Sequence, residues 1–255
     1  MESGRVASPK QVYWAALPER AGAGSDLAFN ALLSVGVRAG QMGYIRLDIP
    51  YTRTDDARNK LSKVFYETAK NPRDTLVMLD VDHEHPHNLL ERLAARDVGV
   101  VGALAFRRSK PYDPCFFLRA KEGMLVQPDD WDKARADIER GTVVGTGAIA
   151  IQRWVFEKLT DAGYKWPWFR FTYSEDHDIQ PGEDVYFGIT CEQIGVPHYC
   201  DFTLETPHQT LTMVTEETFR AHRLERLARQ ELIAEPGNGR DKVRTPFRLE
   251  ERVTA

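Results

Sequence analysis

Two acids and two histidines cluster at the end of one apolar run in the sequence. Residues 75–86 read TLVMLDVDHEHP, so Asp80 and Asp82 close the apolar stretch, and His83 and His85 follow them. In an extended chain, side chains two residues apart lie on the same side. The two carboxylates would then point together and could hold one divalent cation through oxygen ligands, as Mg2+ or Mn2+ requires.

The Asp-x-Asp spacing is not specific by itself. It recurs at residues 130–132 and 176–178, and acids are also frequent at strand ends because they favour turns. The histidines offer a second possibility, because imidazole nitrogens bind zinc. Their position beside Pro86, at an expected helix start, instead predicts capping or exposed side chains for His83 and His85. We therefore assign neither histidine to a metal.

The elements that must position this cluster alternate between short apolar runs and amphipathic helices. This alternation predicts an α/β fold with a mainly parallel sheet and helices on both faces. Ligands of open α/β sheets bind at the carboxyl ends of the strands, where the run at 75–80 places Asp80. Strands are predicted at 11–17, 44–49, 75–80, 97–104, 141–152 and 198–204, and helices at 25–40, 54–70, 86–95, 153–163, 182–195 and 216–234.

The segment at 107–130 differs from the rest, because it is rich in turn residues and lacks helical spacing. It predicts a small antiparallel extension of the fold. The three cysteines are odd in number and form no CxxC, which favours neither a disulfide framework nor a cysteine zinc site.

Length and composition favour a soluble globular protein with one large α/β domain or two small ones. The chain has 255 residues and 42% hydrophobic content, which suits a folded core. No apolar run approaches the roughly 20 residues that span a bilayer, and the first residues lack a signal layout. We therefore expect a cytoplasmic protein without membrane contact. Residues 219–255 carry nine Lys/Arg against six Asp/Glu, so the end of the chain is basic and the body is acidic.

Several separated segments, taken in order, resemble the landmarks of GT-A fold glycosyltransferases, particularly the small family-2-like enzymes of phage genomes. The resemblance covers most of residues 11–210. It implies a GT-A (Rossmann-like) domain at 1–213, whose antiparallel extension lies on the acceptor side, followed by a helix and basic tail at 214–255. The segments are DDARNKLSKVFYETA, TLVMLDVDHEHPHNLLERL, VVGALAFRRS, VVGTGAIAIQRWVFEKL, GEDVYFGITCEQIGVPHYCD and ETPHQT.

The resemblance implies a divalent ion, Mn2+ or Mg2+, that bridges the diphosphate of a nucleotide-sugar such as a UDP-sugar. Asp82 is the implied direct ligand, and Asp80 joins the site and also reaches the ribose or sugar. His208 in ETPHQT would complete the coordination. Such enzymes usually carry a glycine before this histidine, where this chain has Pro207, so an ordinary surface histidine remains the alternative.

The resemblance also implies which residues contact donor and acceptor. Arg58 would contact the nucleotide, unless it is an ordinary helix arginine paired with nearby acids. In members that invert the anomeric carbon, Asp184, beside Glu183, would be the general base for the acceptor hydroxyl. Both acids also suit the first turn of any helix. Further donor contacts are expected at Pro18, Asp48 and Gly147, although glycine is also common at a strand bend.

The predicted function is transfer of a sugar to an acceptor hydroxyl, and a hydroxymethylated pyrimidine in phage DNA is one hypothesis for the acceptor. In that case the protein would act in the host cytoplasm. The basic tail permits this acceptor, whereas the acidic body argues against extensive phosphate contact. The aromatic residues between the last two motifs would either stack on an acceptor or pack in the core: Trp166, Trp168, Phe169, Phe171 and Tyr173.

The main alternative is a phosphohydrolase of the haloacid dehalogenase type, in which Asp80 would be a covalent nucleophile. That family also has an apolar strand that ends in Asp-x-Asp. Here two strand–helix units precede the motif, and no GDGxND-like motif follows it. A nucleotide-sugar binding module without catalysis would lack a base or a metal ligand, and this sequence has candidates for both.

Overall fold

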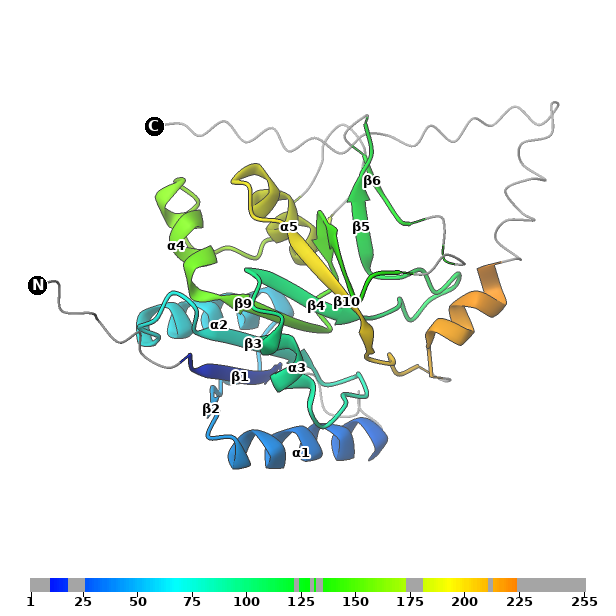
Figure 1. Cartoon of the computed structure of the whole chain (residues 1–255), viewed down its shortest axis with the longest axis horizontal. Helices are drawn as coiled ribbons and strands as arrows, with labels where there is room; N and C mark the ends of the chain where they lie inside the picture. Colours follow the sequence, from blue (N-terminus) through cyan, green and yellow to red (C-terminus); the bar gives the residue numbers. More distant parts are fainter. Residues whose placement is uncertain are drawn as a thin grey trace, which may run out of the picture.

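A seven-stranded sheet forms the centre of the computed structural model (Figure 1). The structure describes residues 10–17, 26–121, 124–128, 131, 135–172, 181–210 and 213–223. The strand order in the large sheet is β2-β1-β3-β9-β4-β10-β7, and a three-stranded sheet has the order β6-β5-β8.

Five strands of the large sheet run in one direction, so the prediction of a mainly parallel sheet is confirmed. The other two, β9 and β7, are antiparallel to their neighbours, and β9 lies between β3 and β4. The parallel strands are β1 (Val12–Leu17), β2 (Ile45–Arg46), β3 (Thr75–Asp80), β4 (Val100–Leu104) and β10 (His198–Glu205). The antiparallel strands are β7 (Ile138–Gly141) and β9 (Ala148–Gln152).

Helices cover both faces of this sheet, as predicted (Figure 1). Helices α1 (Asp26–Gln41) and α3 (Leu89–Ala95) pack on one face, and the other face carries α2 (Thr54–Thr68), α4 (Arg153–Asp161) and α5 (Glu183–Gln193). Among the described residues, no helix combines the length and the apolar character needed to cross a membrane.

The alternation of side chains along β3 explains how one strand serves both cores. Leu76 and Met78 belong to the core beneath α2, α4 and α5, whereas Val77 and Leu79 belong to the core beneath α1 and α3. Successive side chains of a strand point to opposite faces, so Asp80 continues the row of Leu76 and Met78. The first acid of the motif therefore faces α2.

The predicted antiparallel extension is the small sheet, formed by β5 (Phe116–Arg119), β6 (Leu125–Val126) and β8 (Val143–Val144). Residues 216–223 are helical and pack against the body of the fold. Val214 and Phe219 are buried in the core, and the Phe219 ring stacks on Phe106 at 5.6 Å.

One buried histidine makes the stability of this fold sensitive to acid. His198, at the start of β10, is 1% exposed, and neither ring nitrogen has a hydrogen-bond partner in the described part of the chain. Burial lowers the pKa of His198 from 6.5 to about 3. The unfolded chain therefore takes up a proton near its ordinary pKa while the folded chain does not, so stability falls as the pH drops below that value.

Replacing this histidine, as in His198→Leu, should remove that part of the acid sensitivity. Between about pH 7.5 and about pH 5, His198 alone is expected to cost the wild type about 2 kcal/mol of unfolding free energy. Urea unfolding at both pH values would measure the difference. Thr190→Val changes a buried side chain that carries no charge and should keep the wild-type pH dependence. An equal loss in His198→Leu and wild type would contradict the prediction.

Candidate functional site

Two short segments meet beyond the carboxyl end of β3 and carry the candidate metal ligands. Backbone hydrogen bonds join them: the Glu84 amide donates to the Pro207 carbonyl (2.9 Å), and the Gln209 amide donates to the Asp82 carbonyl (2.8 Å). His83 and His208 form an antiparallel bridge, and their rings stack with centroids 4.1 Å apart. Backbone pairing thus brings the predicted ligand His208 beside the β3 motif.

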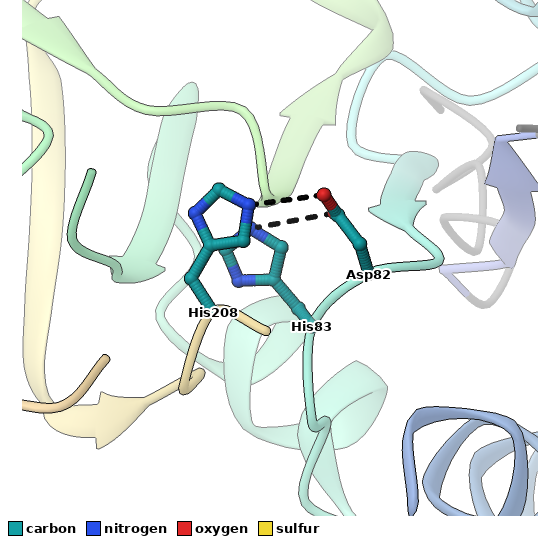
Figure 2. A group of neighbouring side chains, drawn as sticks. All are labelled: Asp82, His83 and His208. Carbon is teal, nitrogen blue, oxygen red and sulfur yellow. Dashed lines mark hydrogen bonds and ion pairs between the residues drawn. The ribbon is translucent and has the colours of Figure 1, made fainter. Parts of the chain in front are cut away.

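Asp82, His83 and His208 place one potential ligand atom each within 4.8 Å of one another. Figure 2 shows the two stacked rings with the Asp82 carboxylate facing both. His208 Nε2 lies 3.0 Å from Asp82 Oδ2, and His83 Nε2 lies 3.9 Å from Asp82 Oδ1. The Asp82 and His83 side chains are almost fully buried, and His208 is 16% exposed.

Backbone carbonyls orient both imidazoles of this group. His83 Nδ1 lies 3.0 Å from the Thr206 carbonyl oxygen, and His208 Nδ1 lies 2.9 Å from that of Phe106. A carbonyl oxygen only accepts hydrogen bonds, so each Nδ1 must carry and donate a proton. The Nε2 atom of each ring therefore faces Asp82. Hydrogen bonds of this kind fix metal-binding imidazoles in proteins. Because His208 Nε2 faces a carboxylate oxygen, that contact requires a proton or a cation, and the group fits a divalent ion.

Burial and neighbouring charges set the protonation of this group. Burial alone would raise the pKa of Asp82, but the hydrogen bond and charge of His208, helped by His83 and Arg108, lower it to about 2. Burial, with the neighbouring charge of His208, lowers the pKa of His83 to about 4. At neutral pH, Asp82 is therefore ionised and His83 is neutral, as metal ligands must be.

Gly147, between β8 and β9, leaves room for the His83 ring. A Cβ atom at this position would lie 2.7 Å from both Nε2 and Cε1 of His83. The Gly147 carbonyl accepts a hydrogen bond from the Asp80 amide (2.8 Å), so its backbone is fixed beside β3. The predicted contact of Gly147 with the donor stays a prediction, whereas its contact with a candidate ligand is observed.

Gly147→Ala is therefore expected to displace the His83 ring and to weaken the binding of a divalent ion by roughly tenfold or more, the usual cost of disturbing a metal ligand's surroundings. Isothermal titration with Mn2+ would measure the change. Gly40→Ala is a matched control near the end of α1, where a Cβ meets nothing within 4 Å. The control should bind Mn2+ like the wild type, and an unchanged affinity in Gly147→Ala would contradict the prediction.

A buried arginine links Asp80 to the start of α5. Arg58 lies on α2 and is 1% exposed. Its Nη2 is 2.7 Å from Asp80 Oδ1, and its Nη1 pairs with Glu183 Oε1. Burial raises the pKa of both Asp80 and Glu183, and the Arg58 charge opposes that rise. Asp80 thus pairs with Arg58 and is not one of the three clustered side chains.

The two acids at the start of α5 have different surroundings. Glu183 is 8% exposed and is held by Arg58, whereas Asp184 remains partly exposed. Burial also raises the pKa of the Asp184 carboxyl, against the opposing charge of Arg58. Asp184 is therefore the more accessible of the two, with a raised affinity for protons.

The predicted donor contacts of Asp48 and Pro18 stay predictions. The Asp48 side chain is 71% exposed and pairs with Arg46 at 2.9 Å. Pro18 lies outside the described part of the chain.

The aromatic segment divides between packing and exposure. Trp168 and Phe169 are buried in the core, and the Asn59 side-chain amide bonds both the N–H and the carbonyl of Phe169 (2.9 and 2.6 Å). Trp166 and Phe171 are 44% and 40% exposed. Tyr173 lies outside the described residues. Packing thus accounts for the middle of this segment.

The expected exposure of His83 and His85 is wrong. His83 is 3% exposed, because residues 207–209 pack beside it. His85 is 2% exposed, and its Nε2 lies 2.7 Å from the Asp80 carbonyl oxygen. Helix α3 begins at Leu89, so neither histidine lies at its start. Sequence reasoning also missed Arg108, whose Nη1 lies 3.0 Å from Asp82 Oδ2.

No protein-family model matches this sequence, and no curated protein matches it. Among solved structures, a protein from STIV aligns with a TM-score of 0.46 and 18% identity, covering 79% of this chain and 86% of that one. The 4-diphosphocytidyl-2C-methyl-D-erythritol synthase of Anaerococcus prevotii aligns with a TM-score of 0.36 and 10% identity (72% and 99% covered).

A Drosophila β-1,4-galactosyltransferase 7 mutant, in complex with manganese, UDP-Gal and xylobiose, aligns with a TM-score of 0.34 and 13% identity. The alignment covers 75% of this chain and 65% of that one. All three TM-scores lie below 0.5, so an inference about function rests on the residues of this chain alone.

Proposed function

We propose that this chain is a metal-dependent glycosyltransferase of the GT-A type, which moves a sugar from a nucleotide-sugar to an acceptor hydroxyl. The observation that carries the proposal is the group of Asp82, His83 and His208, in which backbone carbonyls leave both Nε2 atoms facing the carboxylate. Three protein ligands leave coordination positions for phosphate oxygens. Two imidazoles favour Mn2+ over Mg2+, which prefers oxygen ligands.

The residues around this group supply the remaining functions of a transferase. A bound ion would neutralise charge on the donor's diphosphate. The acceptor oxygen bonds to the anomeric carbon as the bond from that carbon to the β-phosphate oxygen breaks, and the electron pair remains on the diphosphate. Asp184 takes the acceptor's proton, a role that contributes ~10²–10⁴-fold. Glu183 and Arg58 position Asp184 and Asp80, and Asp80 reaches toward the ribose or sugar.

The surroundings of Asp80 favour a transferase over the phosphohydrolase alternative. Asp80, which would be the nucleophile of the phosphohydrolase, pairs through Oδ1 with the buried Arg58 and is not one of the three clustered side chains. The candidate metal group also contains two imidazoles, rather than the oxygen-rich ligand set that suits Mg2+.

Thermal unfolding with Mn2+, with UDP and with both together tests the proposal. A ligand that binds only the folded state raises the Tm, so we expect the largest rise when ion and nucleotide are both present. Mg2+, Zn2+ and a chelator are the controls for the ion, and GDP and CDP are those for the base. If no nucleotide raised the Tm in a metal-dependent way, the proposal would be contradicted. Turnover of a simple phosphomonoester without nucleotide would favour the hydrolase.

For the acceptor, we propose a hydroxymethylated pyrimidine in phage DNA as the first candidate, which would place the protein in the host cytoplasm. Support comes from the basic excess in residues 219–255 and from exposed Lys110 on the loop that carries Arg108. Labelled UDP-sugars should modify hydroxymethylated duplex DNA and leave unmodified duplex unlabelled. Labelling of glycans or peptides alone would reject this acceptor and retain the transferase.

A further inference from the structure

Asp82 also contacts a guanidinium in the structure. Arg108 Nη1 lies 3.0 Å from Asp82 Oδ2, the same oxygen that His208 Nε2 approaches at 3.0 Å. The Asp82 side chain is 4% exposed, whereas that of Arg108 is 53% exposed. Arg108 therefore extends from the surface and places its charged end on a buried candidate ligand atom.

The loop that carries Arg108 has a defined backbone. Hydrogen bonds join the Arg107 amide to the Asp113 carbonyl (2.9 Å) and the Cys115 amide to the Ala105 carbonyl (2.8 Å), in the manner of a hairpin. A long, half-exposed side chain on such a backbone can change its rotamer without moving the loop. The guanidinium can thus leave Asp82 while its attachment point stays beside the site.

Charge determines when the guanidinium should leave. A divalent ion held by Asp82 and the two imidazoles would lie next to Arg108, and like charges at a few ångströms repel. A nucleotide-sugar then brings a negative charge on each phosphate, and the departing diphosphate gains a further one. Guanidinium groups pair well with phosphate because two N–H groups can donate in parallel.

We propose that Arg108 is a tethered counter-ion of this site: it occupies Asp82 before the divalent ion binds, and it pairs with the donor's diphosphate once the ion has taken its place. This role rests on the proposed function. It makes Arg108 both a competitor of the free ion and a ligand of the nucleotide, so one substitution should shift the two affinities in opposite directions.

Titrations of Arg108→Gln with Mn2+ alone, and with UDP at saturating Mn2+, test the proposal. We expect Mn2+ to bind roughly fivefold more tightly, since a competing charge is gone, and UDP to bind roughly tenfold more weakly, since a charge-assisted pair is lost. Arg108→Lys keeps the charge and loses the paired donors, so Mn2+ affinity should match the wild type and UDP affinity should lie between. Arg107→Gln removes one charge from the same loop and should change neither affinity.

If Arg108→Gln bound Mn2+ as tightly as Arg107→Gln does, and likewise bound UDP as tightly, the role of Arg108 would be overturned and the proposed function would stay intact. Weaker Mn2+ binding in Arg108→Gln would also overturn it, because the arginine would then support the site rather than compete for it. If Mn2+ bound neither the wild type nor any variant, the proposed function and this role would fall together.

Discussion

Asp82→Asn is expected to abolish measurable Mn2+ binding and to lower sugar transfer by roughly 10³-fold or more. The substitution keeps the shape of the side chain but removes the negative charge that faces His83 and His208. A catalytic ion contributes several kcal/mol, and each ~1.4 kcal/mol corresponds to tenfold in rate. Release of UDP from a UDP-sugar, followed at saturating Mn2+, would measure the loss, and titration calorimetry would report ion binding.

Asp161→Asn is the matched control for this prediction. It makes the same chemical change at an exposed acid at the end of α4, to which no role in the site is assigned. Its rate and ion affinity should stay near those of the wild type. A rate for Asp82→Asn within about tenfold of the wild type would show that Asp82 holds no catalytic ion.

Arg58→Met is expected to lower the free energy of unfolding by about 3–5 kcal/mol, which is the usual cost of removing one partner of a buried ion pair. Asp80 and Glu183 would keep their buried positions without a counter-charge. Because burial raises the pKa of both acids, the folded variant should take up protons more readily than the unfolded chain. Its deficit against the wild type should therefore shrink as the pH falls, and urea unfolding at several pH values would show this.

The uncharged triple variant Arg58→Met/Asp80→Asn/Glu183→Gln separates charge from packing. It removes the arginine and both acids together, so much of the lost stability should return. Arg46→Met removes an arginine whose side chain is 60% exposed and should cost only a small fraction of the Arg58 effect. Equal losses in the single and triple variants would show that packing, and not unpaired charge, explains the importance of Arg58.

Local sequence patterns predicted the elements of this fold better than their directions. The apolar runs that became β1, β3, β4 and β10 were predicted as strands, and helical spacing located α2, α4 and α5. The reversed direction of β9 has no local signature, because an apolar run reads the same whichever way its neighbours run. β7 was missed for a similar reason, since the polar sequence at 138–141 is a strand only through its pairing with β10.

The sequence predicted the candidate residues that their own type and motif identify. It did not predict burial and contacts that depend on distant segments of the chain. Asp82 and His208 followed from the resemblance, and the structure places them 3.0 Å apart. His83 looked like an exposed residue because its burial depends on a segment far along the chain. The surroundings of Arg58 likewise come from β3 and α5, which no local pattern could join. The assignment of Arg58 to nucleotide binding stays a prediction.

The pairing of residues 82–84 with 207–209 has a consequence for biosynthesis. During translation, Asp82 and His83 leave the ribosome long before His208, so the third candidate ligand arrives only after β10 has been made and has paired with β4. A nascent or truncated chain that stops at Glu205 would carry the acidic motif without its second imidazole. Acquisition of the ion would therefore report that the chain has been made at least as far as His208 and has folded there.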